Sequence, residues 1–315
     1  MLTEVGLGTS SFGNLFHEIS DDDSHAAVDA AWAGGIRHFD TAPHYGLGLA
    51  ETRLGQGLRG RPRDDFVIST KVGRLLVPSP ERSHELDSAE GFMVPAHSER
   101  RWDFSRDGIL RSLDASLDRL GLNDVDILYL HDPDQHWEEA STTGIDTLIE
   151  LRDQGVTHAI GVAMNQSAML TRFLGGYDID VVMVAGRYTL VDQSAADDLL
   201  PAAAERGVGV VAAGIYNSGL LSQPRVPDDA SFEYRAASPD LIERARAIAA
   251  ASERHGVTLP DAAVQFPLRH PAVVSAMIGA RNGPEATAVV ERYDARVPDG
   301  LWDELAVADR VTTHG

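Results

Sequence analysis

Four side chains that can hold or move a proton stand at or just after the ends of apolar runs in the sequence: Asp40, Tyr45, Lys71 and His131. Apolar runs of this length are typical of buried strands. Asp40 closes the first run, and Tyr45 follows five residues later. Lys71 closes the second run and His131 closes the third. The runs cover residues 35–39, 66–70 and 127–130. Strands that each end on such a residue predict one site built from successive strand ends.

The four residue types suit one kind of chemistry. A tyrosine near its reference pKa of about 10 is a poor proton donor or acceptor at neutral pH. A neighbouring ammonium stabilises the phenolate and lowers this pKa, so we expect Lys71 to activate Tyr45. Asp40 is expected to keep Lys71 charged and oriented, and His131 is expected to hydrogen-bond a substrate oxygen beside Tyr45. The set predicts a proton relay for a carbonyl/alcohol couple.

Taken singly, each residue also has a structural interpretation. Aspartate and lysine at strand ends often pair, Tyr45 alone fits packing, and His131 precedes a turn-like sequence at residues 132–134. The catalytic interpretation therefore depends on the joint placement of all four residues.

The elements that must position these residues alternate regularly. Strands are predicted near residues 5, 36, 66, 126, 159, 181, 208 and 273. Helices are predicted at residues 24–33, 50–58, 106–120, 142–154, 167–174, 195–206, 239–255, 259–269 and 299–309, with another beginning near Pro284. Eight alternating units predict a closed (β/α)8 TIM barrel, class α/β, forming a single domain over residues 1–315. In such barrels the active site lies at the carboxyl ends of the strands.

Two segments, residues 72–105 and 214–238, interrupt the alternation. Neither has a sustained hydrophobic period, and the first contains Pro78, Pro80 and Pro95. Structureless segments of this length in a compact domain are commonly functional or disordered. We expect both to be long loops at the carboxyl-terminal face that shape the pocket, although the first also fits a plain surface insertion.

The composition narrows the classes of function. Acidic residues outnumber basic ones by 48 to 27, and the formal charge of −21 disfavours nucleic acid and anionic membrane surfaces as partners. The chain has no cysteine, which excludes disulfides, thiolate chemistry and cysteine-based zinc sites. Neither a signal peptide nor an apolar stretch of membrane-spanning length is recognisable. A cytoplasmic protein with a small-molecule ligand is expected.

Three stretches resemble the signatures of the aldo-keto reductase superfamily: residues 39–46 (FDTAPHYG), 69–73 (STKVG) and 128–132 (LYLHD). The similarity extends in order along nearly the whole chain. It implies hydride transfer between C4 of a nicotinamide and a carbonyl carbon, without a metal. It also implies that Tyr45 is the general acid/base, that Lys71 and Asp40 tune it, and that His131 orients the substrate.

The resemblance also implies where the cofactor binds. Asn165 is similar to the asparagine that holds the nicotinamide carboxamide, although the serine and glutamine that usually accompany it are not matched. Residues 212–214 (AAG) replace the usual stacking tyrosine, so Tyr188 and Tyr216 are the candidates. The segment around residues 219–221 resembles the pyrophosphate-binding one, and residues 278–282 resemble the loop at the adenosine phosphate, which leads into a helix N-terminus. The predicted contacts are Asn165, Tyr188, Tyr216, Ser218, Gly219, Leu220, Gly279, Ala280, Arg281 and Glu285.

The same loop bears on the choice between NAD and NADP. Arg281 can pair with a 2′-phosphate, but residues 284–286 (PEA) lack the second basic residue usual in NADP-preferring members. Glu285 can instead accept a ribose hydroxyl. We therefore favour NAD and leave NADP open. A dehydrogenase of the Rossmann type is disfavoured because no Gly-x-Gly-x-x-Gly follows the first strand.

Within the superfamily, four stretches resemble a bacterial aldose 1-dehydrogenase branch that includes L-fucose, D-threo-aldose and pyridoxal 4-dehydrogenases. They are residues 102–105 (WDFS), 161–166 (GVAMNQ), 185–190 (AGRYTL) and 216–219 (YNSG). This resemblance implies oxidation of a cyclic hemiacetal carbon to a lactone. Trp102 can stack on an apolar sugar face. Predicted hydroxyl ligands are His44, Asp103, Arg187 and Asn217.

Three other functions stay open at this point. The first is the reduction of aldehydes or ketones with NADPH, and the second, within the branch, is pyridoxal 4-dehydrogenation. The third is a regulatory or channel-associated subunit that senses nicotinamide, against which the complete set of four residues argues. The substrate, the direction of reaction and the oligomeric state are not predicted.

Overall fold

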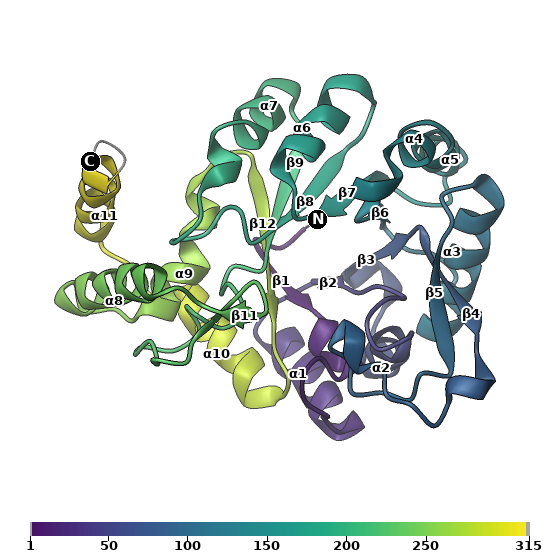
Figure 1. Cartoon of the computed structure of the whole chain (residues 1–315), viewed down its shortest axis with the longest axis horizontal. Coiled ribbons are helices and arrows are strands. Elements are labelled where there is room, and N and C mark those ends of the chain that lie inside the picture. The colour runs from purple at the N-terminus through teal and green to yellow at the C-terminus, as the bar shows by residue number, and fades with distance from the viewer. Residues whose placement is uncertain (1, 313–315) are drawn as a thin grey trace.

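Eight parallel strands close into a barrel in the computed structural model, which describes residues 2–312 (Figure 1). Around the barrel the order is β1, β2, β3, β6, β7, β8, β9 and β12, with β12 paired to β1. The predicted barrel and all eight predicted strand positions are confirmed. The strands are β1 Val5–Gly8, β2 His38–Asp40, β3 Val67–Val72, β6 Ile127–His131, β7 Ala159–Met164, β8 Val181–Ala185, β9 Gly209–Ala213 and β12 Val273–Gly279.

Helices surround the barrel (Figure 1). They are α1 Asp21–Ala33, α2 Leu49–Leu58, α3 Arg106–Leu120, α4 Trp137–Glu139, α5 Ile145–Asp153, α6 Ser167–Gly176, α7 Leu199–Arg206, α8 Pro239–Arg254, α9 Leu259–Gln265, α10 Gly283–Asp294 and α11 Asp299–Thr312. Ser20 and Ser105 cap α1 and α3 by accepting backbone hydrogen bonds through their side chains. The helix predicted at 142–154 begins instead as a π-helical turn at residues 140–144, and the one predicted at 259–269 ends early, before Pro267. No helix in residues 2–312 has the length and apolar character needed to cross a bilayer.

Strand periodicity decides which residues point into the barrel. In β6, Ile127 and Tyr129 pack with the apolar cluster inside the barrel, whereas Leu128 and Leu130 pack with the cluster between barrel and helices. Because side chains alternate along a strand, His131 shares the inward side of Tyr129. Lys71 pairs in register with Tyr129 on the neighbouring strand. The sequence thus places the ends of β3 and β6 beside each other with polar side chains directed inward.

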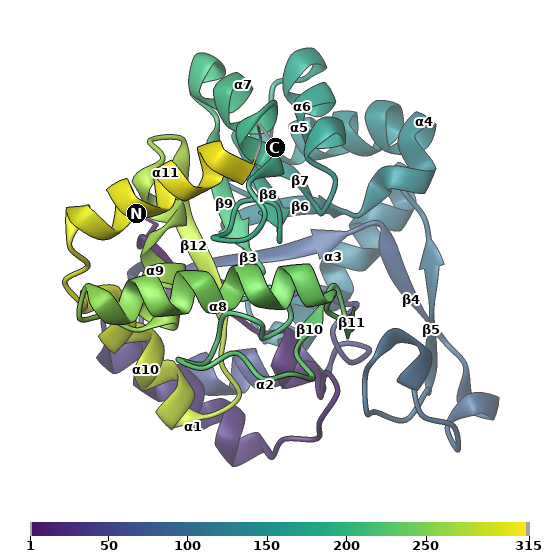
Figure 2. The same cartoon turned by 60° about the vertical axis from the view of Figure 1, so that its left-hand side comes forward.

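The segment 72–105 departs from its predicted irregular form. It contains an antiparallel hairpin of β4 Arg74–Pro78 and β5 Ser98–Trp102, which stands beside the barrel near α3 (Figure 2). Its strands escaped prediction because charged residues occupy both sides of β5, so no apolar alternation marks it. The segment 214–238 also contains two short paired strands, β10 Ser231–Phe232 and β11 Arg235–Ala236.

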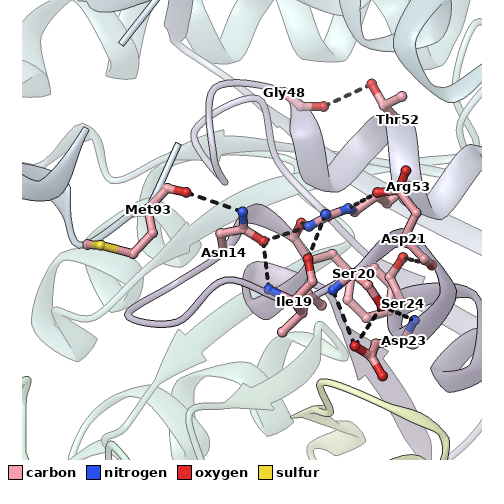
Figure 3. A network of polar contacts seen from close by, with 11 residues as sticks. Asn14, Ile19, Ser20, Asp21, Asp23, Ser24, Gly48, Thr52, Arg53 and Met93 are labelled. Carbon is pink, nitrogen blue, oxygen red and sulfur yellow. Dashed lines mark hydrogen bonds and ion pairs between the residues drawn. The ribbon is translucent and has the colours of Figure 1, made fainter. Parts of the chain in front are cut away.

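A hub of polar contacts fixes the loop that follows β1 (Figure 3). Arg53 of α2 donates to Asp21 (2.7 Å), to the backbone oxygen of Phe12 (2.8 Å) and to Oδ1 of Asn14 (2.7 Å). A further bond reaches the backbone oxygen of Ile19 (2.8 Å). Asn14 in turn donates to the backbone oxygen of Met93 (3.2 Å). The hub therefore ties α2 and the first loop to the long insertion.

Replacing Arg53 by alanine should lower the free energy of unfolding by about 3 kcal/mol, because buried acceptors lose their donor. Asp21→Ala is the matched control. It should cost less than about 1 kcal/mol, because the Asp21 side chain is 64% exposed and the pair is screened by solvent. Thermal and denaturant unfolding of both variants measure the difference. Equal stability of the two variants would contradict a role for the hub.

Candidate active site

The four predicted catalytic residues meet at the carboxyl-terminal rim of the barrel. Asp40, Lys71 and His131 lie at or near the ends of β2, β3 and β6, which are neighbours in the barrel. Tyr45 stands in the loop that follows β2, where its amide donates to the backbone oxygen of Ala42 (3.1 Å). The strand order alone therefore brings together residues that are far apart along the chain.

A buried ion pair joins two of the four residues. Nζ of Lys71 lies 2.5 Å from Oδ1 of Asp40, and the two side chains are only 2% and 4% exposed. Lys71 also donates to the backbone oxygen of Thr41 (2.9 Å), and the hydroxyl of Ser69 donates to Oδ2 of Asp40 (2.7 Å). Burial acts to lower the pKa of Lys71, but Asp40 and Tyr45 outweigh it and raise the pKa above its ordinary value. The predicted function of Asp40, to keep Lys71 charged and oriented, fits this geometry.

Tyr45 lies against this pair. Nζ of Lys71 is 4.8 Å from the centre of the Tyr45 ring, and the ring of His131 stands edge-on to that of Tyr45 at 5.9 Å. Burial raises the pKa of Tyr45 most strongly, the charge of Lys71 acts to lower it, and Asp40 raises it further. The net pKa lies above the ordinary value of 10.0. Lys71 thus acts on the pKa of Tyr45 in the expected direction, but burial outweighs its charge and the net shift is upward.

Two histidines flank the phenol in neutral form. Burial lowers the pKa of His131 well below its usual range, and Arg74 and Lys71 lower it further. Burial, Arg74 and Arg100 together lower the pKa of His44 to about 2. The two histidine rings are 5.6 Å apart. A neutral imidazole can orient a substrate oxygen by hydrogen bonding without adding charge.

Sequence reasoning missed three charged residues beside these histidines: Arg74, Arg100 and Asp132. Arg74, at the start of β4, approaches Nδ1 of His44 (3.3 Å) and forms an ion pair with Asp132. Arg100 of β5 donates to the backbone oxygen of His44 (2.8 Å). The available signals were adjacency to the 69–73 signature for Arg74 and to His131 for Asp132. Arg100 had no such signal, because the hairpin that brings it to the site was not predicted.

The predicted substrate ligands have different surroundings. His44 lies among the catalytic residues. Trp102 is 39% exposed, and its ring stacks on Phe104 at 5.9 Å. Asp103 accepts from the hydroxyl of Ser105 (2.5 Å) and pairs with Arg111 (3.1 Å), which commits it to the start of α3.

The other two predicted ligands belong to the loops after β8 and β9. The guanidinium of Arg187 pairs with Asp192 (3.3 Å) and with Glu233, at the tip of the β10–β11 hairpin. Nδ2 of Asn217 donates to the backbone oxygen of Gly186 (3.3 Å). Oδ1 of Asn217 is buried and has no partner among the described residues. An unpartnered acceptor here fits a ligand that carries amide or hydroxyl donors, as a nicotinamide dinucleotide does.

The two candidate stacking tyrosines are both held by protein contacts. The ring of Tyr188 packs on Phe266 (5.1 Å) and on His270 (5.9 Å) in the layer between barrel and helices. The hydroxyl of Tyr216 accepts from Arg292 of α10 (2.8 Å). Asn165 is exposed just beyond the end of β7. Of these residues, only Asn165 has a side chain largely open to a ligand.

The predicted pyrophosphate segment, at residues 218–220, has an unusual backbone conformation. Asn217 and Ser218 have φ of 46° and 58°, and Gly219 has φ of 95°. The Leu220 side chain is 1% exposed, and the hydroxyl of Ser218 accepts from the amide of Tyr234 (3.0 Å). The amides of Asn217, Gly219 and Leu220 donate to the backbone oxygens of Gly214 (2.9 Å), Tyr216 (3.0 Å) and Asn217 (3.2 Å), so the segment is a run of tight turns.

At the predicted adenosine-phosphate loop, a carboxylate of the chain itself sits on the anion-binding groups. Glu285 accepts from the backbone amide of Arg281 (2.8 Å) and pairs with its guanidinium (2.6 Å). Asn282 caps α10 by accepting from the amide of Glu285 (3.0 Å). Gly279 ends β12, and the backbone oxygen of Ala280 accepts from the hydroxyl of Ser11 (2.8 Å). An added phosphate here would have to displace Glu285.

Comparison with known proteins agrees with this geometry. The family model described as "Aldo/keto reductase family" matches residues 4–309. The chain is 46% identical to D-threo-aldose 1-dehydrogenase from Pseudomonas sp over 311 residues, covering 98% of this chain and 94% of that one. It is 37% identical to pyridoxal 4-dehydrogenase from Microbacterium luteolum, covering 96% and 93%.

A solved structure shows the same fold at low identity. The glycerol dehydrogenase AKR11B4 from Gluconobacter oxydans superposes with a TM-score of 0.78 at 23% identity, covering 97% of this chain and 90% of that one. The predicted superfamily and barrel are thereby confirmed. The chain belongs to the aldo/keto reductase family and is an NAD(P)-dependent oxidoreductase.

Proposed function

We propose that this enzyme oxidises the cyclic hemiacetal of an aldose at C1 to the lactone, with NAD as the preferred cofactor. The observation that carries the proposal is the buried Lys71–Asp40 pair set against Tyr45 at the barrel rim. The similarity to a D-threo-aldose 1-dehydrogenase over nearly the whole chain supports the choice of an aldose. The polar residues around the phenol suit a hydroxylated substrate.

In this mechanism Tyr45 takes the proton of the C1 hydroxyl. Lys71 stabilises the developing phenolate by its charge, and Asp40 holds Lys71 in place through the 2.5 Å contact. His131, which stays neutral, hydrogen-bonds the reacting oxygen and orients it toward the phenol. The bound nicotinamide supplies the acceptor for the hydride that leaves C1. The C–H and O–H bonds of the hemiacetal are thus exchanged for the carbonyl of the lactone.

The preference for NAD follows from the loop before α10. The Arg281 guanidinium, which would otherwise attract a 2′-phosphate, is paired with Glu285. The Glu285 carboxylate would repel that phosphate and can accept a ribose hydroxyl instead. Asn165, Asn217 and the backbone of residues 218–220 would hold the rest of the cofactor.

A second candidate substrate is pyridoxal, oxidised at its 4-position. The observation that favours it is the 37% identity to a pyridoxal 4-dehydrogenase. Initial rates with a panel of aldoses, pyridoxal and a simple aromatic aldehyde, each with both cofactors, separate these functions from reduction of aldehydes with NADPH. Oxidation of an aldose with NAD at the highest kcat/KM is the expected result.

Replacing Tyr45 by phenylalanine should reduce turnover by at least about a thousandfold, because no other group is placed to take the proton. Binding of NADH, measured by fluorescence, should change by less than about threefold. Tyr129→Phe is the matched control, because that hydroxyl is buried in the same barrel without a partner among the described residues. A Tyr45→Phe variant that keeps more than a tenth of the activity would refute the assignment.

The pH dependence should differ between the two directions of reaction. Because the pKa of Tyr45 is raised above 10.0, its phenolate fraction grows by about tenfold for each pH unit below that pKa. Oxidation should therefore speed up steadily between about pH 6 and pH 9, whereas reduction, which uses the protonated phenol, should stay nearly flat. His44, with a pKa of about 2, and His131 remain neutral, so neither profile should bend near pH 6.5. A histidine-like bend in both directions would contradict this assignment.

Glu285→Ala should shift the cofactor preference toward NADP by about tenfold or more, because it frees the guanidinium and the backbone amide of Arg281 for a phosphate. The ratio of kcat/KM for NADP to that for NAD measures the shift. In the double variant Glu285→Ala/Arg281→Ala the gain should disappear. An unchanged ratio in the single variant would mean that this pair lies outside the cofactor site.

A further inference from the structure

An ion pair beside the phenol has no place in the mechanism so far. Arg74 of β4 pairs with Oδ2 of Asp132, the residue that follows the end of β6. The same Oδ2 lies 3.6 Å from Nε2 of His131. The side chains of Arg74 and Asp132 are only 14% and 29% exposed. The pair therefore contacts His131, the residue proposed to orient the reacting oxygen.

Neighbouring side chains hold Arg74 in a fixed position. Its guanidinium lies over the ring of Trp102, with Cζ 4.5 Å from the ring centre, and one amino group approaches Nδ1 of His44 (3.3 Å). Such a cation–π contact is favourable, and more so when it is shielded from water. Asp132 is held as well, in a left-handed conformation with φ of 42°, by a bond from its amide to the backbone oxygen of Ala163 (2.9 Å). Non-glycine residues in that conformation are uncommon and often functional.

The pair nevertheless leaves hydrogen-bonding capacity unused. Nε of Arg74 is buried and has no acceptor among the described residues. Oδ2 of Asp132 accepts from Arg74, whereas Oδ1 takes part in no hydrogen bond among the described residues. Nε of Arg74 is shielded from a ligand, so the free acceptor of the pair is Oδ1 of Asp132, which suits the donor of a hydroxyl group.

The charge balance selects the class of ligand. The guanidinium and the carboxylate neutralise each other, so the pair offers no net attraction to an anion or a cation. An apolar group placed there would leave the free carboxylate oxygen without a partner, which costs free energy. A neutral polyol supplies the hydroxyl donor that this oxygen lacks.

We propose that Arg74 and Asp132 form a substrate hydroxyl-binding pair that selects for hydroxyls close to the reacting carbon. Asp132 accepts from the substrate hydroxyl through Oδ1, and Arg74 acts as the positioning residue that holds the carboxylate. The proposal deepens the function proposed above, because it names the residues that separate a hydroxylated substrate from a plain aldehyde. It also gives the β4–β5 hairpin a function, since the hairpin carries Arg74.

The test compares two aldehydes that differ in their hydroxyls, glyceraldehyde and propanal, both reduced with NADH. The wild-type enzyme should prefer glyceraldehyde. Asp132→Asn should lower kcat/KM for glyceraldehyde by about 10- to 100-fold, mostly through KM, as expected for loss of a hydrogen bond to a charged group. For propanal the loss should stay within about threefold.

Arg74 variants test its positioning function. Selectivity here is the ratio of kcat/KM for glyceraldehyde to that for propanal. Arg74→Gln should lower this selectivity about as much as Asp132→Asn does, whereas Arg74→Lys, which keeps the charge, should retain part of it. The double variant Arg74→Gln/Asp132→Asn should lose no more selectivity than either single variant, because both act on one interaction. It also leaves no unpaired buried charge, so it remains informative if a single variant unfolds.

The matched control lies at the other end of β6. Arg63 pairs with Asp124 (2.5 Å) and with Asp126 (2.7 Å), just before the strand begins. Arg63→Gln should lower the midpoint of thermal unfolding. It should leave the ratio of kcat/KM for glyceraldehyde to that for propanal unchanged. Equal losses for both aldehydes in Asp132→Asn would overturn the proposal, because Asp132 would then act only through His131. An Asp132→Asn variant with unchanged kcat/KM for both aldehydes would overturn it as well.

This experiment separates the pair from the proposed function. A wild-type enzyme that prefers glyceraldehyde but oxidises no aldose supports the pair and refutes the aldose dehydrogenase. A wild-type enzyme that oxidises aldoses but does not prefer glyceraldehyde refutes the pair alone. An enzyme that neither reduces the two aldehydes nor oxidises any aldose would overturn both proposals.

Discussion

The active site depends on a lysine and an aspartate buried together. Removing two charges from water is expensive, and such a pair is stable only if the geometry is good and the remaining polar groups are satisfied. Lys71 and Asp40 meet these conditions through their 2.5 Å contact and the bonds to Thr41 and Ser69. Closure of the barrel sets the register of β2 and β3 that makes these contacts possible. The fold therefore supplies a fixed positive charge beside Tyr45 without requiring any movement.

Around this charge the protein keeps other groups neutral or paired. His131 is buried, His44 is half-buried, and both are uncharged at physiological pH. The neighbouring Arg74 and Arg100 each have a carboxylate partner. Among the described residues, Lys71 is the cation closest to the ring of Tyr45, and the charges of Arg74 and Arg100 are balanced by their carboxylate partners. The loop proposed to bind the cofactor is similar in this respect, since the guanidinium of Arg281 is paired with the carboxylate of Glu285. Such an arrangement suits a neutral, hydroxylated substrate.

Most of the fold and the centre of the site could be predicted because local pattern decides them. Apolar runs located the eight strands, and each of Asp40, Lys71 and His131 ends such a run, so barrel closure alone brings them together. The β4–β5 hairpin could not be predicted, because its register depends on pairing with a distant strand and β5 carries charged side chains on both of its sides. The direction of the Tyr45 pKa shift was also beyond reach, because it depends on how completely the folded chain buries the ring. The contact of the Tyr188 ring with Phe266 was beyond reach for a similar reason, since it arises only from packing in the folded chain.

The most direct measurement concerns the buried pair itself. The double variant Lys71→Met/Asp40→Asn removes both charges together, so it leaves no unpaired ion in the barrel and should remain folded. If Lys71 activates Tyr45, this variant should bind NADH with an affinity close to that of the wild type and turn over at least about a thousandfold more slowly. A folded double variant that retains most of the wild-type turnover would show that the chemistry does not depend on this pair, and it would contradict the proposed active site.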